Sequence, residues 1–330
     1  MIKGRIMSHI ILILMVIIFW PGPVQSAAAP LPNLIQQTRF IAYTPRSFSS
    51  GGGSGKIHAA TEAGIREDLT LLHPFFNGVI TYSATSGLEA VPRIAHELGF
   101  RALILGIWDP SSETEIDNVI HATQKYPDLI GAIIVGNEGL YTRRYLPQDV
   151  DKAMQRIKKE CPEMAVTTSE PFFLYFEKEY TNFFKSHDLL MPNIHPVFEK
   201  WFTASNPAQG VDMVIEMADK FQSTYTKPLL IKETGMPGYS SHDGSNKDKG
   251  FSMERQRLFW SDILKRFPFS PSQSLACFEA FDAPWKPAEM AATLPGDHSS
   301  EAFWGFFNKD GKAKQVLEAL PRLPGSLQDL

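Results

Sequence analysis

Short apolar runs alternate with segments of helical periodicity along the chain from residue 39 onward. The apolar runs end in polar or aromatic residues and span residues 40–48, 78–84, 102–110, 130–140, 164–172, 189–197, 228–237 and 275–285. Apolar residues recur at helical spacing between several of them, at residues 60–72, 114–126, 211–221 and 253–267. Continuously apolar strands that alternate with helices are typical of a parallel sheet covered by helices. Eight such units predict an α/β fold with a single (β/α)8 TIM barrel, and a doubly wound open sheet is the alternative.

Polar side chains gather where these runs end. The fourth run ends in Asn137 and Glu138, and the seventh ends in Lys232 and Glu233. The fifth, sixth and eighth runs contribute Ser169, Glu170, Asn193, His195, Glu199, Glu279, Asp282 and Trp285. Because the C-terminal ends of all strands of a barrel meet at one mouth, the pattern predicts an acidic site with aromatic walls there.

Three kinds of function fit such a site. The chain has no nucleophile elbow around a serine, no H-E-x-x-H spacing and no EF-hand loop. Paired carboxylates could hydrolyse a glycosidic bond. Carboxylate and imidazole groups could instead hold Mg²⁺ or Mn²⁺, with Glu138, Glu170, Glu233, Asp282 and His195 as the candidate ligands. A sugar-binding protein without catalysis is the third alternative.

Composition narrows the choice of partners. The chain has 330 residues, 43% of them hydrophobic, with a formal net charge of −4. This balance predicts no nucleic-acid partner and no stable association with an anionic membrane surface. Aromatic residues make up 12% of the chain, which suits a sugar-binding site and a packed core equally well.

The N-terminus has the features of a secretory signal peptide. Lys3 and Arg5 precede an apolar run at residues 10–20, prolines follow it, and Ser26 begins a stretch of small residues. The apolar run is shorter than the ~20 residues that a bilayer span needs. We therefore expect residues 1–28 to be a signal peptide and residues 29–330 to be the catalytic domain of an exported protein, periplasmic or secreted. An uncleaved membrane anchor is the alternative.

The chain has two cysteines, Cys161 and Cys277, which an exported protein could bridge. Cys277 lies within an apolar run, so burial as a small hydrophobic residue is favoured. No C-x-x-C spacing supports a zinc site.

Several motifs, in order along the chain, resemble those of glycoside hydrolase family 17, a family of β-1,3-glucanases and glucanosyltransferases. They include VGNE at residues 135–138, KETGMP at 232–237, IREDLTLLHPFFNGVITYS at 65–83, VTTSEPF at 166–172 and NIHPVFE at 193–199. FEAFDAPWK at residues 278–286 and FWGFFNKDGKAK at 303–314 are similar to the bacterial branch in particular. The match runs from about residue 40 to residue 314.

The resemblance implies a retaining glycosidase on a (β/α)8 barrel, with a β-glucan as substrate and no cofactor. It implies that Glu138 is the acid/base and Glu233 the nucleophile. Glu138 would stay protonated because ionised Glu233 lies near it. Asn137 would donate its amide to the sugar 2-hydroxyl or to the nucleophile.

Other residues at the predicted mouth are candidates for substrate binding. The aromatic side chains that could stack on sugar rings are Tyr43, Tyr82, Trp108, Tyr239 and Trp285. The polar candidates are Glu170, His195, Glu279 and Asp282. The chain also departs from the family at Met236 and Phe172, where members usually have tryptophan, and at the added arginines Arg143 and Arg144. These departures bear on the length and linkage of the substrate.

Overall fold

A computed structural model describes residues 31–50, 56–239, 249–293 and 296–324. The expected signal peptide at residues 1–28 lies outside the described residues. Within them, no helix combines the length and the apolar character that crossing a membrane requires.

The strands form a closed parallel barrel. Five strands pair in sequence order: β1 (Phe40–Ala42), β2 (Gly78–Ile80), β3 (Ala102–Ile107), β4 (Ile130–Asn137) and β5 (Val166–Ser169). β6 (Leu229–Ile231) pairs in parallel with β7 (Gln273–Leu275). A parallel bridge from Ile41 to Cys277 joins the last position to the first. The predicted (β/α)8 fold is confirmed.

The sixth barrel position differs from the prediction of a regular strand at residues 189–197. Only isolated parallel bridges occur there, from Leu190 to β6 and from Asn193 to Pro171 and to Glu233. Pro192 and Pro196 interrupt this segment, and a proline has no N–H to donate to a strand ladder. The segment therefore fills a strand position without forming a continuous strand.

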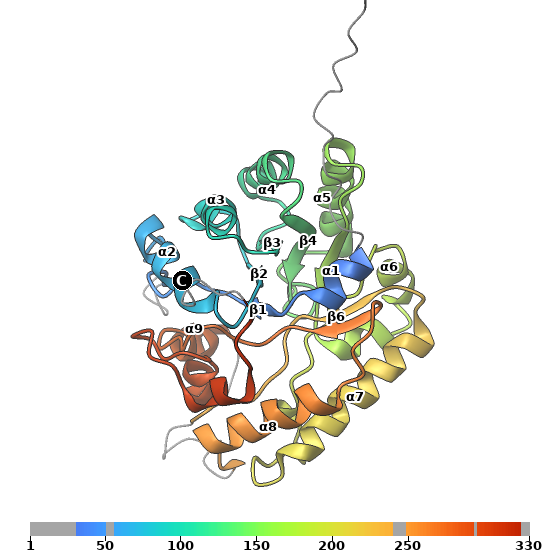
Figure 1. Ribbon diagram of the computed structural model, residues 1–330. Coiled ribbons are helices and arrows are strands. Elements are labelled where there is room, and N and C mark those ends of the chain that lie inside the picture. Colours follow the sequence, from blue (N-terminus) through green and yellow to red (C-terminus); the bar gives the residue numbers. More distant parts are fainter. Residues whose placement is uncertain (1–30, 51–55, 240–248, 294–295, 325–330) are drawn as a thin grey trace, which may run out of the picture.

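The helices surround the strands, except for α1, which lies over one end of the barrel (Figure 1). They are α1 (Leu31–Gln37), α2 (Glu62–Leu72), α3 (Val91–Glu97), α4 (Glu113–Lys125), α5 (Pro147–Glu160), α6 (Thr181–Lys185), α7 (Pro207–Thr224), α8 (Met253–Arg266) and α9 (Lys286–Thr293). Short 3₁₀ helices lie at Leu88–Ala90, Phe172–Phe176, Pro196–Phe198, Ser299–Phe303 and Gln315–Ala319. The N-cap residues of α2, α4 and α8 are Thr61, Ser112 and Ser252, whose hydroxyls accept a backbone N–H of the first turn.

Alternation along the strands divides the core into two apolar clusters. Residues of one parity point into the barrel, such as Ile80, Ile104 and Ile134, and they pack with Leu34 of α1. Residues of the other parity, such as Val79 and Ile133, pack against the surrounding helices. Because the strands are buried, most of them carry apolar residues, while β5 and β7 also contain the buried polar residues Thr167, Thr168, Gln273 and Ser274.

Candidate active site

Glu138 directly follows β4 and has an unusual backbone conformation. Its φ is 52°, in the left-handed region that residues other than glycine rarely adopt. Such a conformation costs of order 1–3 kcal/mol and persists only where the surroundings impose it. Here the backbone N–H of Glu138 donates to the carbonyl of Ser169 (2.8 Å), and its carbonyl accepts from the N–H of Thr142 (3.0 Å). The strand end thus holds Glu138 in place.

Glu233 lies two residues beyond β6 and is 6% exposed. Its Oε1 accepts hydrogen bonds from the hydroxyl of Tyr82 (2.9 Å) and from Nζ of Lys232 (2.7 Å). Its Oε2 lies 3.3 Å from Nε2 of His195. Side chains from three barrel positions therefore converge on one carboxylate.

The two glutamates have opposite pKa shifts. Burial by itself would raise the pKa of Glu233, but the charge of Lys232 and the hydrogen bond from His195 lower that pKa well below its ordinary value. Burial and the negative charge of Glu233 raise the pKa of Glu138. These shifts favour the ionised form of Glu233 and the protonated form of Glu138.

Two amide side chains connect the glutamates. Oδ1 of Asn137 accepts from Nζ of Lys232 (2.6 Å) and from Nδ2 of Asn193 (3.3 Å). Nδ2 of Asn193 also donates to Oε1 of Glu138 (2.9 Å), while its Oδ1 accepts from the hydroxyl of Ser169 (3.0 Å). Since both donors use the oxygen of Asn137, its amide nitrogen is the group left to donate to a ligand.

His195 contacts Glu233 through its Nε2 atom. Its Nδ1 is buried and has no hydrogen-bond partner among the residues that the structure describes, and its ring packs edge-on against Phe278 and Trp304 at 5.3 and 5.2 Å. The sequence analysis assigned His195 to sugar binding, whereas here it touches the carboxylate.

Two candidate sugar contacts are wrong. The ring of Tyr43 is 0% exposed, and its hydroxyl donates to the buried Asp68 (3.1 Å), so it offers no face to a ligand. Glu170 is also 0% exposed, and it accepts the backbone N–H groups of Leu140 (3.0 Å) and Tyr141 (3.2 Å). Its carboxylate is used to organise the segment that follows Glu138.

The acidic candidates after β7 form buried ion pairs. Both oxygens of Glu279 lie 2.6 Å from Nζ of Lys286, and burial raises the pKa of Glu279 to about 7. Asp282 accepts from Nζ of Lys314 (2.8 Å) and from the N–H of Gly305 (2.9 Å). These carboxylates are occupied by protein donors.

The other aromatic candidates have different surroundings. Tyr82 is half-buried against Glu233, and half-buried Trp285 packs edge-on against Phe48 at 5.9 Å. Trp108 is 40% exposed and carries the guanidinium of Arg144 over its ring at 4.1 Å. Met236 is fully buried, so the change from tryptophan at this position lies in the core.

Sequence reasoning missed several residues at this end of the barrel. Exposed aromatic side chains lie in the segments that follow the strands, namely Tyr141, Phe173, Phe198 and Trp201, together with the expected Tyr239. Tyr141 and Phe173 pack edge-to-face at 5.5 Å although they follow different strands. Lys232 was visible in its motif, but a lysine beside a glutamate is usually a solvated pair, and nothing in the sequence indicated its burial.

Both cysteines are buried and free. Burial of Cys277 is therefore confirmed, and it raises the pKa of the Cys277 thiol to about 12. Among the residues that the structure describes, no group of three or more histidine, cysteine, aspartate or glutamate side chains is arranged to hold a metal ion.

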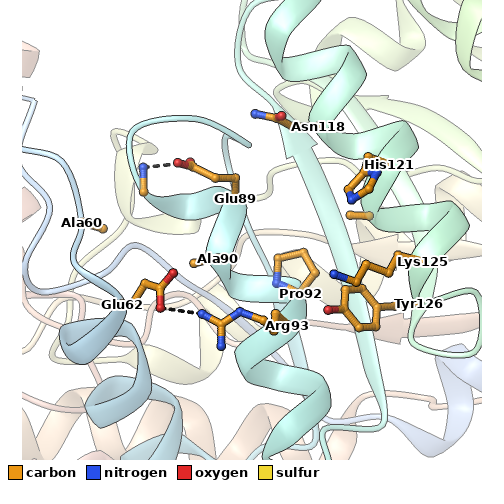
Figure 2. Close-up of a pocket in the computed structure, with 12 residues that line it drawn as sticks. Ala60, Glu62, Glu89, Ala90, Pro92, Arg93, Asn118, His121, Lys125 and Tyr126 are labelled. Carbon is orange, nitrogen blue, oxygen red and sulfur yellow. Dashed lines mark hydrogen bonds and ion pairs between the residues drawn. The ribbon is translucent and has the colours of Figure 1, made fainter.

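A hollow of about 480 Å³ lies on the outer wall of the barrel, away from this site. It is lined by residues of α3, α4 and the segments before α2 and α3, and Figure 2 shows Arg93 paired with Glu62 there. None of the residues around Glu138 and Glu233 lines it.

Gly136 and Gly139 make room for Tyr145 behind Glu138. A Cβ on Gly136, whose φ is 83°, would lie 2.1 Å from the hydroxyl of Tyr145, and one on Gly139 would lie 1.9 Å from the ring. The hydroxyl of Tyr145 accepts from the N–H of Gly139 (3.0 Å) and donates to Glu170 (3.3 Å). The side chain of Tyr145 therefore cannot move away from an added Cβ without losing both of these hydrogen bonds.

We expect Gly136→Ala to destabilise the protein more than Gly99→Ala does. Gly99 has a similar φ of 77° but no atom within 4 Å of the added Cβ, so it isolates the backbone cost of about 1–2 kcal/mol. The clash with Tyr145 should add about 1–3 kcal/mol at Gly136. Chemical denaturation of both variants measures the difference, and equal losses would contradict the packing role of Tyr145.

The barrel places two glutamates at its fourth and seventh strand positions, one favoured as an acid and the other as a carboxylate. Two carboxyl groups that face each other at one end of such a barrel are the arrangement of a glycoside hydrolase. The chain belongs to the BtgE/BtgC glycoside hydrolase domain family, whose model matches residues 41–305.

Individual proteins agree with this assignment. The chain is 23% identical over 299 residues to a glucan 1,3-β-glucosidase of Arthroderma benhamiae, covering 88% of this chain and 95% of that protein. It spans 38–42% of the length of three Aspergillus relatives.

Solved structures share the fold. An endo-laminarinase from Formosa Hel1_33_131 has a TM-score of 0.65 at 21% identity, covering 84% of this chain and 85% of that one. The glycoside hydrolase family 17 β-1,3-glucanosyltransferase of Rhizomucor miehei, solved as an active-site mutant with laminaritriose, has a TM-score of 0.62 at 22% identity, covering 86% and 97%. The expected resemblance to family 17 is confirmed, while membership of its bacterial branch stays a prediction.

Proposed function

We propose that this protein cleaves β-1,3-linked glucan with retention of configuration, with Glu138 as acid/base and Glu233 as nucleophile. The observation that carries the proposal is the difference between the two carboxyl groups. Glu233 receives hydrogen bonds from Tyr82 and Lys232 and lies against His195, while Glu138 is linked to it through the amides of Asn137 and Asn193. The named activities of the relatives support β-1,3-glucan as the substrate class.

In the first step, Glu233 attacks the anomeric carbon while Glu138 gives its proton to the leaving oxygen. The negative charge of Glu233 disappears in the glycosyl ester, so the pKa of Glu138 falls and it becomes a base. In the second step Glu138 accepts a proton from water, and the water oxygen displaces Glu233. The amide of Asn137 is suited to donate to the sugar during both steps.

Transfer to a second sugar is the alternative outcome, because the same ester can react with a sugar hydroxyl in place of water. A β-1,3-glucanosyltransferase among the structural neighbours supports this alternative. The exposed aromatic side chains Tyr141, Phe173 and Phe198 could hold an acceptor sugar by stacking.

Incubation with laminari-oligosaccharides of defined length tests the proposal. We expect shorter products from hydrolysis, and proton NMR at early times should show the β-anomer as the first product. Products longer than the substrate would identify transfer instead. Binding without turnover, or an initial α-anomer, would contradict the proposed mechanism. Activity that EDTA abolishes and Mg²⁺ restores would contradict a mechanism that rests on two carboxylates alone.

A further inference from the structure

Lys232 is a cation buried next to the proposed nucleophile. The residue is 1% exposed, and the hydrogen bonds of its ammonium group go to Asn137 (2.6 Å) and Glu233 (2.7 Å). The ammonium also lies 4.1 Å from the centre of the Tyr82 ring. Removing an ammonium group from water costs several kcal/mol unless its partners compensate, so a buried pair is weak evidence for a purely stabilising role.

The two oxygens of Glu233 are held differently. Oε1 accepts from both Tyr82 (2.9 Å) and Lys232 (2.7 Å), while among the described residues Oε2 has a single, longer contact, with His195 (3.3 Å). Hydrogen bonds to charged groups are the strong ones, and they occupy the lone pairs that an attacking oxygen needs. Oε2 is therefore the oxygen with more of its electron density free.

We propose that Lys232 is a positioning residue that holds Oε1 of Glu233 and directs Oε2 to attack the sugar. This inference rests on the proposed function and deepens it. The carbonyl oxygen of the resulting ester is Oε1, which remains hydrogen-bonded to Tyr82 and Lys232. Asn137 is oriented by the same ammonium group, so Lys232 also turns the amide nitrogen of Asn137 toward the substrate side.

Each step balances in atoms and charge. A lone pair of Oε2 forms the bond to the anomeric carbon, the glycosidic C–O bond breaks, and the departing oxygen takes the proton of Glu138. The negative charge thus moves from Glu233 to Glu138. In the second step water loses a proton to Glu138, its oxygen bonds to the anomeric carbon, and the C–Oε2 bond returns its electron pair to Glu233.

Lys232 remains the counter-charge through both steps. It interacts electrostatically with both glutamates, and it contacts Glu233 directly and Glu138 through the amides of Asn137 and Asn193. A fixed ammonium between them balances the negative charge wherever that charge resides. No movement of the protein is then needed between the steps.

The charged and titratable groups around Glu233 determine the direction in which its pKa shifts when Lys232 is removed. They are Tyr82 after β2, Glu138 after β4, His195 at the sixth position, Lys232 beside it, and Glu279 and Lys286 after β7. Lys232 lowers the pKa of both Glu233 and Glu138. Its removal must therefore raise both pKa values.

The test compares pH profiles of kcat/KM on laminari-oligosaccharides for the wild type, Lys232→Met and Lys158→Met. Methionine keeps much of the length of lysine without its charge, and Lys158 forms an ion pair with Asp188 (2.8 Å) on the surface as the matched control. The acid limb of this profile reports the ionisation of the nucleophile, and the basic limb reports the acid/base. We expect both limbs to move to higher pH in Lys232→Met.

The expected shift of the acid limb is about one pH unit or more, which lowers kcat/KM about tenfold on that side of the profile. The limbs of Lys158→Met should coincide with those of the wild type. An unmoved acid limb in folded Lys232→Met would overturn the role of Lys232, because loss of packing alone does not shift both limbs in one direction.

Two further outcomes are decisive. If Lys232→Met does not fold, the acid limb of the wild-type pH profile tests the role of Lys232 instead. An acid limb at or above the ordinary glutamate pKa of 4.5 would show that the ammonium does not act on Glu233. A wild-type protein that cleaves no laminari-oligosaccharide at any pH contradicts the proposed function itself. Cleavage with unmoved limbs contradicts the role of Lys232 alone.

Discussion

Glu233→Ala should lower kcat by a factor on the order of 10⁴ or more on laminari-oligosaccharides, because it removes the group that forms the covalent intermediate. Water in the space left by the carboxylate is a much weaker nucleophile, because no general base remains on that face of the sugar to take its proton. Initial rates of oligosaccharide cleavage measure the loss. Glu216→Ala, on the exposed part of α7, is the surface control and should retain the wild-type rate.

Azide distinguishes loss of the nucleophile from general damage to the site. The alanine leaves a space where the carboxylate stood, and azide bound there can attack an activated aryl glycoside. The product should be the α-glycosyl azide, because only one displacement has occurred. A β-configured azide, or a rate near that of the wild type without azide, would refute the role of Glu233.

Glu138→Gln should slow cleavage of oligosaccharides by about 10²–10⁴-fold, the range that general acid catalysis contributes. A leaving sugar hydroxyl needs the proton, whereas a nitrophenolate does not. The loss in the first step should therefore be much smaller with nitrophenyl glycosides. Comparing the two substrate types on the same variant separates proton donation from substrate binding, and equal losses with both would refute the role of Glu138.

The pH profile gives a second test of Glu138. Because burial and Glu233 raise its pKa, Glu138 stays protonated to a higher pH than an ordinary glutamate, and kcat/KM falls as the pH rises through that pKa. The variant has no proton to lose at this position, so the basic limb should disappear. A basic limb that persists unchanged in Glu138→Gln would assign it to another group.

Local sequence patterns were reliable where one physical requirement dominated. The strand at residues 130–137 is buried on both faces, so both its apolar run and its polar end could be recognised in the sequence. The helix at residues 253–266 has its apolar stripe and a serine at its start. Residues 189–197 have the same apolar character, yet their prolines reduce the segment to isolated bridges.

The roles of individual side chains were harder to predict from the sequence than the strands and helices. Tyr43 and Tyr82 both follow a barrel strand, but Tyr43 bonds to Asp68 in the core while Tyr82 bonds to Glu233. Glu170 follows β5 as Glu138 follows β4, yet it holds backbone N–H groups. Residue type and position along a strand do not specify which neighbours a side chain meets.

The sequence by itself determined the barrel and placed Glu138 and Glu233 at the ends of its fourth and seventh positions, while the resemblance to family 17 selected these two as the proposed catalytic pair. Periodicity and strand-end chemistry are properties of short segments, so they can be read without knowing the packing. Only the tertiary structure decided that Lys232 is buried, that its ammonium joins Asn137 to Glu233, and that Oε1 and Oε2 differ. Those facts depend on contacts between residues as far apart as 82, 137, 195 and 232, and their electrostatic effect depends on burial that no single segment encodes.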